Sequence, residues 1–167
     1  MLWDSKGGNP ENISKDNPYD SATWFDFYSF NHVAITAFIY GLVISFIALF
    51  GKLTEKTILY GFILANVIHG IDEISNNLCG ISLEGWYHNV VLGRKGKQID
   101  RDTWQNSLGD LISCLVGTSI IMFVALYSKG SPYCILLVSI TLLLSCWFII
   151  WSFKEKQVLC GNSDWGM

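Results

Sequence analysis

Carboxylate, imidazole and amide side chains recur inside stretches that are otherwise apolar, and these residues are the ones that could do chemistry. In the second apolar stretch, a polar series with spacings of three, four and three residues consists of Asn66, His69, Glu73 and Asn76. These spacings place the four side chains on one face of a helix. Asp72 precedes Glu73 and is turned from it by about 100° on a helix, so the sequence leaves open which acid points inward.

A second polar face follows in the third apolar stretch. Its members, at spacings of four, four, three and four residues, are Asp102, Asn106, Asp110, Ser113 and Gly117. The second helix would end, and the third would begin, on the same side of a membrane. A charge at the bilayer centre costs at least about 2.5–3.5 kcal/mol, so the two acidic faces are expected to turn toward each other. The sequence therefore predicts a polar pocket at the depth of the lipid headgroups.

The predicted pocket has several candidate occupants. Two ionised carboxylates at close range repel each other, so a cation is expected near Glu73 and Asp110. That cation could be an arginine such as Arg94 from the connecting loop, a divalent metal ion or a cationic lipid headgroup. Carboxylates with imidazole suit a hard or borderline divalent ion, although the chain has no HExxH motif. Arg94 could alternatively hold a phosphate.

A purely structural role is the alternative for the same side chains. Asn, Ser and Asp on facing membrane helices also form interhelical hydrogen bonds, and Gly109 and Gly117 would then permit close packing. We favour a ligand site, because acids inside a membrane are functional hypotheses by default. The sequence assigns no catalytic residue and no definite metal ligand. The predicted ligand-binding residues are His69, Asp72, Glu73, Asn76, Arg94, Asp102, Asn106 and Asp110.

Four apolar stretches must position these residues. Of the 167 residues, 51% are hydrophobic and only 15% are charged, whereas soluble domains have about 25% charged residues. A membrane-spanning helix needs roughly 20 apolar residues, and stretches of about that length occupy residues 30–50, 57–76, 105–128 and 132–153. We therefore predict an all-α integral membrane protein with four transmembrane helices. A net charge of −3 without a basic stripe argues against a nucleic-acid partner.

The spans also define the organisation of the chain. They separate a polar N-terminal segment, a transmembrane domain and a polar C-terminal tail, at residues 1–28, 29–153 and 154–167. Between the second and third spans, residues 81–92 combine aromatic and apolar side chains. We predict that they lie in the membrane interface, with an ordered loop packed on the helix ends as the alternative. Both termini and the connection between the second and third spans lie on one side of the membrane. That side carries eight of the eleven lysines and arginines. The positive-inside rule then places both termini in the cytoplasm.

The polar residues also form a recognisable series of short motifs. An Asp-Glu helix end, a Gly-Arg loop and an Asp…Asn…Gly…Gly helix start occur in residues 69–77, 93–96 and 102–117. Over about residues 24–120, this pattern resembles the VanZ-like membrane family. The chain departs from that family in an insert over residues 79–92 and in Asn77, where glutamine is common. Through residues 29–32 and 106–110 the chain is also similar to an uncharacterised bacterial inner-membrane family. The resemblance implies the fold and the pocket, and it leaves the chemistry open.

Three functions are compatible with these features. The first is binding or handling of a lipid headgroup or another small polar ligand by the acidic pocket. The second is a structural role in a larger membrane-protein assembly, with contacts from the apolar fourth helix and the polar termini. The third is metal-assisted hydrolysis or transfer on a membrane phospho-substrate. We rank them in that order.

Overall fold

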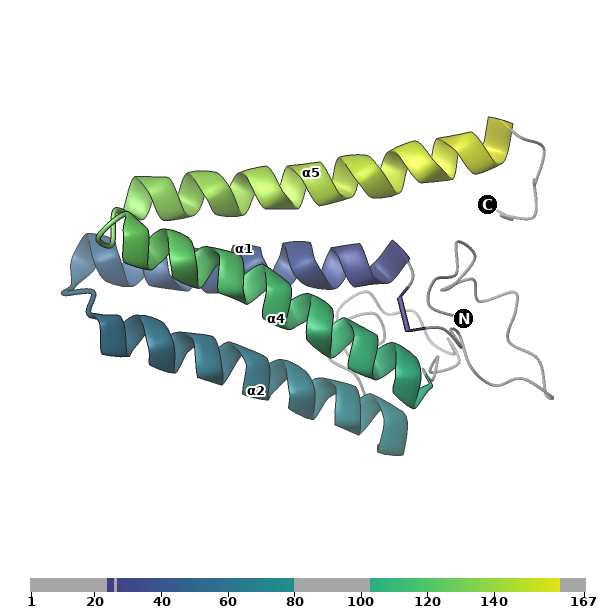
Figure 1. The fold of residues 1–167 in the computed structure, drawn as a ribbon, viewed down its shortest axis with the longest axis horizontal. Helices are drawn as coiled ribbons and strands as arrows, with labels where there is room; N and C mark the ends of the chain where they lie inside the picture. The colour runs from purple at the N-terminus through teal and green to yellow at the C-terminus, as the bar shows by residue number, and fades with distance from the viewer. Residues whose placement is uncertain (1–23, 26, 80–102, 160–167) are drawn as a thin grey trace, which may run out of the picture. The chain divides into compact units, whose positions relative to one another are not determined.

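The computed structural model describes residues 24–25, 27–79 and 103–159. The helices in this part of the chain are α1 (Phe27–Phe50), α2 (Glu55–Cys79), α4 (Trp104–Tyr127) and α5 (Pro132–Leu159) (Figure 1). Each is long and apolar enough to cross a membrane, so the prediction of an all-α fold with four membrane-spanning helices is confirmed. The predicted interfacial segment, residues 81–92, lies outside the described residues.

Threonines cap the starts of two helices. The Thr54 hydroxyl accepts a hydrogen bond from the backbone N–H of Thr57 at 3.2 Å, and the Thr103 hydroxyl accepts one from Asn106 at 3.3 Å. Each cap satisfies a backbone donor that lacks a partner within the helix. The N-terminus of α5 has no such threonine cap in the described part of the chain and instead has Pro132 in its first turn. Proline loses no hydrogen bond at this position.

The end of α4 is a Schellman motif whose left-handed residue is a lysine. The backbone N–H of Gly130 donates to the carbonyl of Ala125 at 2.8 Å, and that of Lys129 donates to Leu126 at 3.2 Å. The φ angles of Lys129 and Gly130 are 52° and 77°. Glycine is the usual residue at the first of these positions, and a residue with a side chain there costs roughly 1 kcal/mol.

Contacts divide the chain into two units, and α2 and α4 each contribute residues to both. Unit 1 consists of Met1–Tyr28 and Val67–Ile112, and unit 2 consists of Ser29–Asn66 and Ser113–Met167. The second part of α2 and the first part of α4 therefore belong to unit 1. Unit 2 contains nearly all of α1, the first part of α2, the second part of α4 and the whole of α5.

Unit 2 has an apolar core to which all four helices contribute. Its buried members are Ala37, Tyr40, Ile44, Ile58, Ile121, Ala125 and Ile135. Many large apolar side chains nevertheless remain on the outside, with Phe46 and Leu137 more than three-fifths exposed. Lipid is as apolar as these side chains, so helix association in a membrane depends on close packing and hydrogen bonds rather than on the hydrophobic effect.

Two glycines let the helices of unit 2 approach closely. A Cβ added at Gly117 of α4 would overlap the backbone carbonyl oxygen of Val33 in α1. A Cβ added at Gly41 of α1 would overlap the hydroxyl of Ser139 in α5. Ser139 is fully buried, and its hydroxyl donates to the carbonyl of Ile135 at 2.7 Å. α1 therefore contacts α4 and α5 at positions that leave no room for a larger side chain.

Buried and partly buried hydrogen bonds also join the helices of unit 2. The Tyr40 hydroxyl of α1 donates to the carbonyl of Ile58 in α2 at 2.7 Å. The Asn66 amide of α2 donates to the Thr118 hydroxyl of α4 at 3.0 Å, and the Cys114 thiol donates to the Asn66 carbonyl oxygen at 3.4 Å. Asn66, which the sequence placed on the polar face of α2, thus serves as an interhelical hydrogen-bonding residue.

We expect Tyr40→Phe to lower the free energy of unfolding by about 1 kcal/mol, because it removes one buried interhelical hydrogen bond and keeps the ring. Unfolding of the detergent-solubilised chain by SDS, followed by far-UV circular dichroism, measures the change. Tyr133→Phe is the matched control, since Tyr133 is 76% exposed, and it should unfold like the wild type. Equal stability of the two variants would show that the Tyr40 hydroxyl contributes nothing.

Candidate functional site

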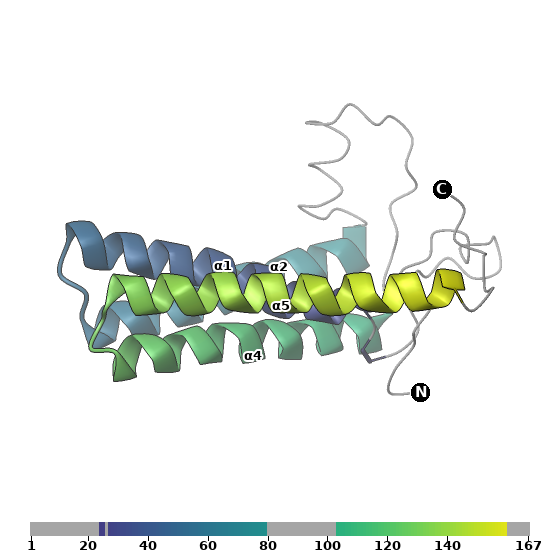
Figure 2. The ribbon, with the colours of Figure 1, turned by 90° about the horizontal axis from the view of Figure 1, so that it is seen from above.

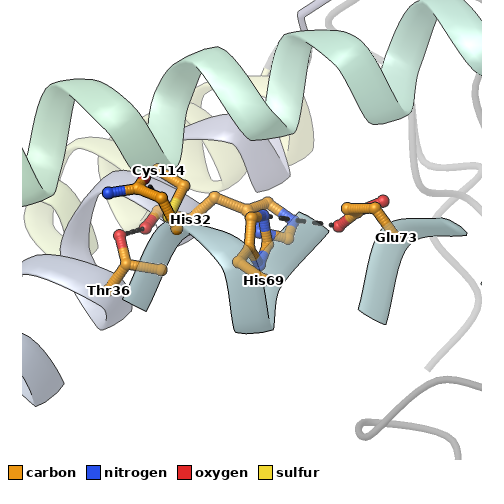
Figure 3. Close-up of polar contacts among 6 residues, drawn as sticks. His32, Thr36, His69, Glu73 and Cys114 are labelled. Atoms are coloured by element: carbon orange, nitrogen blue, oxygen red, sulfur yellow. Dashed lines mark hydrogen bonds and ion pairs between the residues drawn. The ribbon is translucent and has the colours of Figure 1, made fainter. Parts of the chain in front are cut away.

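A polar cluster in unit 1 begins on the second part of α2. His69 and Glu73 lie one helical turn apart, with the histidine Nε2 3.5 Å from the glutamate Oε1 (Figure 3). Each of these side chains is only 10% exposed. Asp72 is half-buried, whereas Glu73 is buried. Of the two neighbouring acids, Glu73 is therefore the one that turns inward.

The first part of α4 brings a second acid to the same cluster. Asp110 is 2% exposed and lies close enough to Glu73 for direct electrostatic interaction. The Ser107 side chain is hydrogen-bonded to the Glu73 carboxylate. Asn106 and Ser107 are also buried. Unit 1 therefore encloses two carboxylates, one from each helix, together with neutral hydrogen-bonding groups.

Of two glycines beside this cluster, Gly109 is the one that a close backbone contact requires. Gly109, which precedes Asp110, lies against the backbone of Trp24, and a Cβ at Gly109 would overlap the Trp24 carbonyl oxygen. A Cβ at Gly70 of α2 would lie 3.7 Å from Leu111 Cδ1 of α4, which is ordinary van der Waals contact. The segment at Trp24 thus lies directly beside the buried face of α4.

The predicted ligand-binding residues fall into two groups. Unit 1 contains five of them in the described part of the chain, namely His69, Asp72, Glu73, Asn106 and Asp110. The structure brings Glu73 together with His69, Asp72 and Asp110. Arg94 and Asp102 lie outside the described residues, as does the side chain of Asn76. Ligand binding by all eight stays a prediction.

Two polar residues near the start of α1, Asn31 and His32, belong to unit 2. The Asn31 side-chain oxygen accepts a hydrogen bond from the indole N–H of Trp147 in α5 at 3.2 Å. The backbone carbonyl of His32 accepts a hydrogen bond from the hydroxyl of Thr36, which lies one turn further along α1 (Figure 3). Asn31 therefore joins two helices of unit 2.

Sequence reasoning missed Ser107 and Trp24 as neighbours of the acids. Ser107 lies three residues before Asp110, so helical spacing alone could have placed both on one face. The contact of Trp24 with Gly109 had no such signal, because the two residues are far apart in sequence and Trp24 precedes α1.

The cluster offers acceptors for a cationic group. Two carboxylates shielded from water retain their attraction for a positive charge, since no solvent screens it. The imidazole of His69 adds a nitrogen that can accept a hydrogen bond or ligate a metal. Comparison of the chain with protein-family models, with curated proteins and with solved structures finds no match.

Proposed function

We propose that this polytopic membrane protein binds a small polar ligand through a cationic group, and that the ammonium group of a lipid headgroup is the ligand that fits best. The observation that carries the proposal is the pair of buried acids, Glu73 on α2 and Asp110 on α4, in one electrostatic cluster. Two ionised carboxylates at this range repel each other. A cation beside both carboxylates would offset that repulsion.

The depth of the cluster supports a headgroup rather than an acyl chain as the ligand. Glu73 lies two residues before the end of the candidate span Glu55–Ser75, and Asp110 lies six residues inside the span Trp104–Tyr127. At about 1.5 Å per residue, both acids are within about 10 Å of a span end. The Asn106 amide could donate to the phosphate or hydroxyl groups of the same headgroup.

The phosphate of such a headgroup would need its own partner. Arg94 is the predicted residue for that role, because a guanidinium can contact a phosphate with two hydrogen bonds. The resemblance to the VanZ-like family involves the same acids and the same Gly-Arg loop, so it supports a shared polar pocket. A zwitterionic lipid with an amine and a phosphate would use both parts of the proposed site.

Glu73→Gln and Asp110→Asn test the proposal with little change in shape. Hydrogen bonds to charged groups contribute about 1.5–3 kcal/mol, so each variant should retain about tenfold less amine-headgroup lipid than the wild type. The measurement is mass spectrometry of lipids extracted from the detergent-purified full chain, normalised to protein. Glu55→Gln removes an exposed acid in unit 2 and should retain the wild-type amount. If the double variant with Glu73→Gln and Asp110→Asn retained the wild-type amount of amine-headgroup lipid, the proposal would be disproved.

A divalent metal ion is a second candidate ligand, because of the His69–Glu73 pair. An imidazole nitrogen and a carboxylate oxygen 3.5 Å apart are close to the separation of two ligands on one ion, whose bonds are about 2.0–2.2 Å long. A bound metal would permit hydrolysis or group transfer on a membrane phospho-substrate. Elemental analysis of the purified chain distinguishes the two: near-stoichiometric metal, lost in His69→Ala while amine lipid is retained, would favour the metal.

A further inference from the structure

The two short turns of unit 2 lie together at one end of that unit (Figures 1 and 2). Leu53, in the turn between α1 and α2, lies against Gly130 in the turn between α4 and α5. The Ser45 hydroxyl near the end of α1 donates to the carbonyl of Pro132 at 3.3 Å. These contacts hold the two turns beside each other, so charged residues on them share one surface.

That surface is basic. Lys52, Lys56 and Lys129 are all exposed on the two turns and the first turn of α2, and Glu55 is the acid among them. We call the three lysines the basic end of unit 2. In the described part of the two turns they leave an excess of positive charge at the point where the helices leave the hydrocarbon layer.

Exposed aromatic side chains flank the basic end. The members of this group, each at least 65% exposed, are Phe50, Tyr60, Tyr127 and Tyr133. Tyrosines with an apolar ring and a polar hydroxyl collect at the boundary between lipid tails and headgroups. Their position beside the lysines places the ammonium groups at headgroup level, where the phosphates of phospholipids lie.

Lys129 occupies its position against the local preference of the backbone. It is the left-handed residue of the Schellman motif, where glycine is usual. A side chain there is strained, so a positive charge stands where a glycine would fit the turn better. The turn therefore does not require a lysine at position 129. Replacing Lys129 separates the effect of its charge on lipid binding from its effect on stability.

We propose that the basic end binds the phosphate groups of anionic phospholipids and so anchors unit 2 to an anionic leaflet. Charge complementarity determines the ligand: three ammonium groups at headgroup depth attract anionic lipid, and each lysine near a membrane surface contributes enough to change affinity about fivefold. This site is separate from the acids of unit 1, which attract the opposite charge. Its success or failure does not depend on the function proposed for those acids.

Native mass spectrometry of the detergent-solubilised full chain tests the proposal with two soluble short-chain lipids, a phosphatidylglycerol and a phosphatidylcholine. Lys52→Gln, Lys56→Gln and Lys129→Gln should each raise the dissociation constant for phosphatidylglycerol about fivefold and leave phosphatidylcholine unchanged. Glu55→Gln should lower the constant for phosphatidylglycerol. The triple Lys→Arg variant keeps the charge and should bind like the wild type.

Lys129→Gly separates lipid binding from folding. It relieves the left-handed strain, so it should unfold at or above the wild-type SDS concentration while its phosphatidylglycerol affinity falls about fivefold. Unchanged phosphatidylglycerol affinity in the triple Lys→Gln variant would overturn the proposal. An equal loss of both lipids would also overturn it, because the lysines would then be acting on the fold rather than on the anionic headgroup.

Discussion

Gly117→Ala is expected to lower the free energy of unfolding by about 2–3 kcal/mol. The new Cβ would overlap the Val33 carbonyl oxygen and lie 3.1 Å from the Val33 carbonyl carbon and Cα. These are backbone atoms of α1, so no side-chain rotation relieves the clash and the two helices must separate. The higher helix propensity of alanine, about 1 kcal/mol over glycine, offsets only part of the lost packing.

Gly70→Ala is the matched control for this substitution. It makes the same chemical change in a membrane-spanning helix, but its Cβ would meet only Leu111 Cδ1, at 3.7 Å. It should therefore unfold like the wild type or at slightly higher SDS concentration, because only the propensity gain remains. If Gly117→Ala proved as stable as Gly70→Ala, close backbone contact between α1 and α4 would not be a source of stability.

The second large effect is expected at the contact of α1 with α5, and a second substitution across the contact should restore the lost stability. Gly41→Ala places a Cβ against the Ser139 hydroxyl and 2.9 Å from the Ser139 Cβ, and should cost about 2 kcal/mol. Ser139→Gly removes both clashing atoms. The double variant exchanges the side chains across the contact and should recover most of the lost stability, with a coupling energy of about 1–2 kcal/mol.

A glycine elsewhere on α5 shows whether the recovery is local. Ser145 is exposed on the same helix, so Ser145→Gly makes the same change away from Gly41. Combined with Gly41→Ala, it should add its own propensity cost of about 0.5–1 kcal/mol and rescue nothing. Recovery with Ser145→Gly, or its absence with Ser139→Gly, would mean that the contact between Gly41 and Ser139 does not limit the packing of α1 on α5.

The helices were predictable from the sequence because their signal is one of length and charge. An apolar stretch near 20 residues without a lysine or a glutamate has few other stable solutions in a chain with 15% charged residues. The second span was the least regular, since Asp72 and Glu73 interrupt it, yet α2 runs through both acids to Cys79. The backbone hydrogen bonds of the helix stabilise it by more than the two acids cost, because these side chains have polar neighbours.

The site was predictable only as far as helical periodicity reaches. The spacing that put His69 and Glu73 on one face, and Asn106 and Asp110 on another, needs no knowledge of tertiary structure. The choice between Asp72 and Glu73 depends on how α2 is rotated against α4, which side-chain contacts decide. The contact of Gly41 with Ser139 was likewise invisible, because a single glycine or serine in an apolar helix has no pattern that names its partner.

The length of α5 exceeds what a membrane span requires. Its membrane-spanning part, Pro132–Ser152, is 21 residues long and crosses about 30 Å at 1.5 Å per residue. The helix nevertheless continues without a break to Leu159 (Figure 2). Those last turns extend the helix by about 10 Å beyond the length that crosses the hydrocarbon layer, so Lys154, Glu155 and Lys156 continue α5 without having to enter lipid.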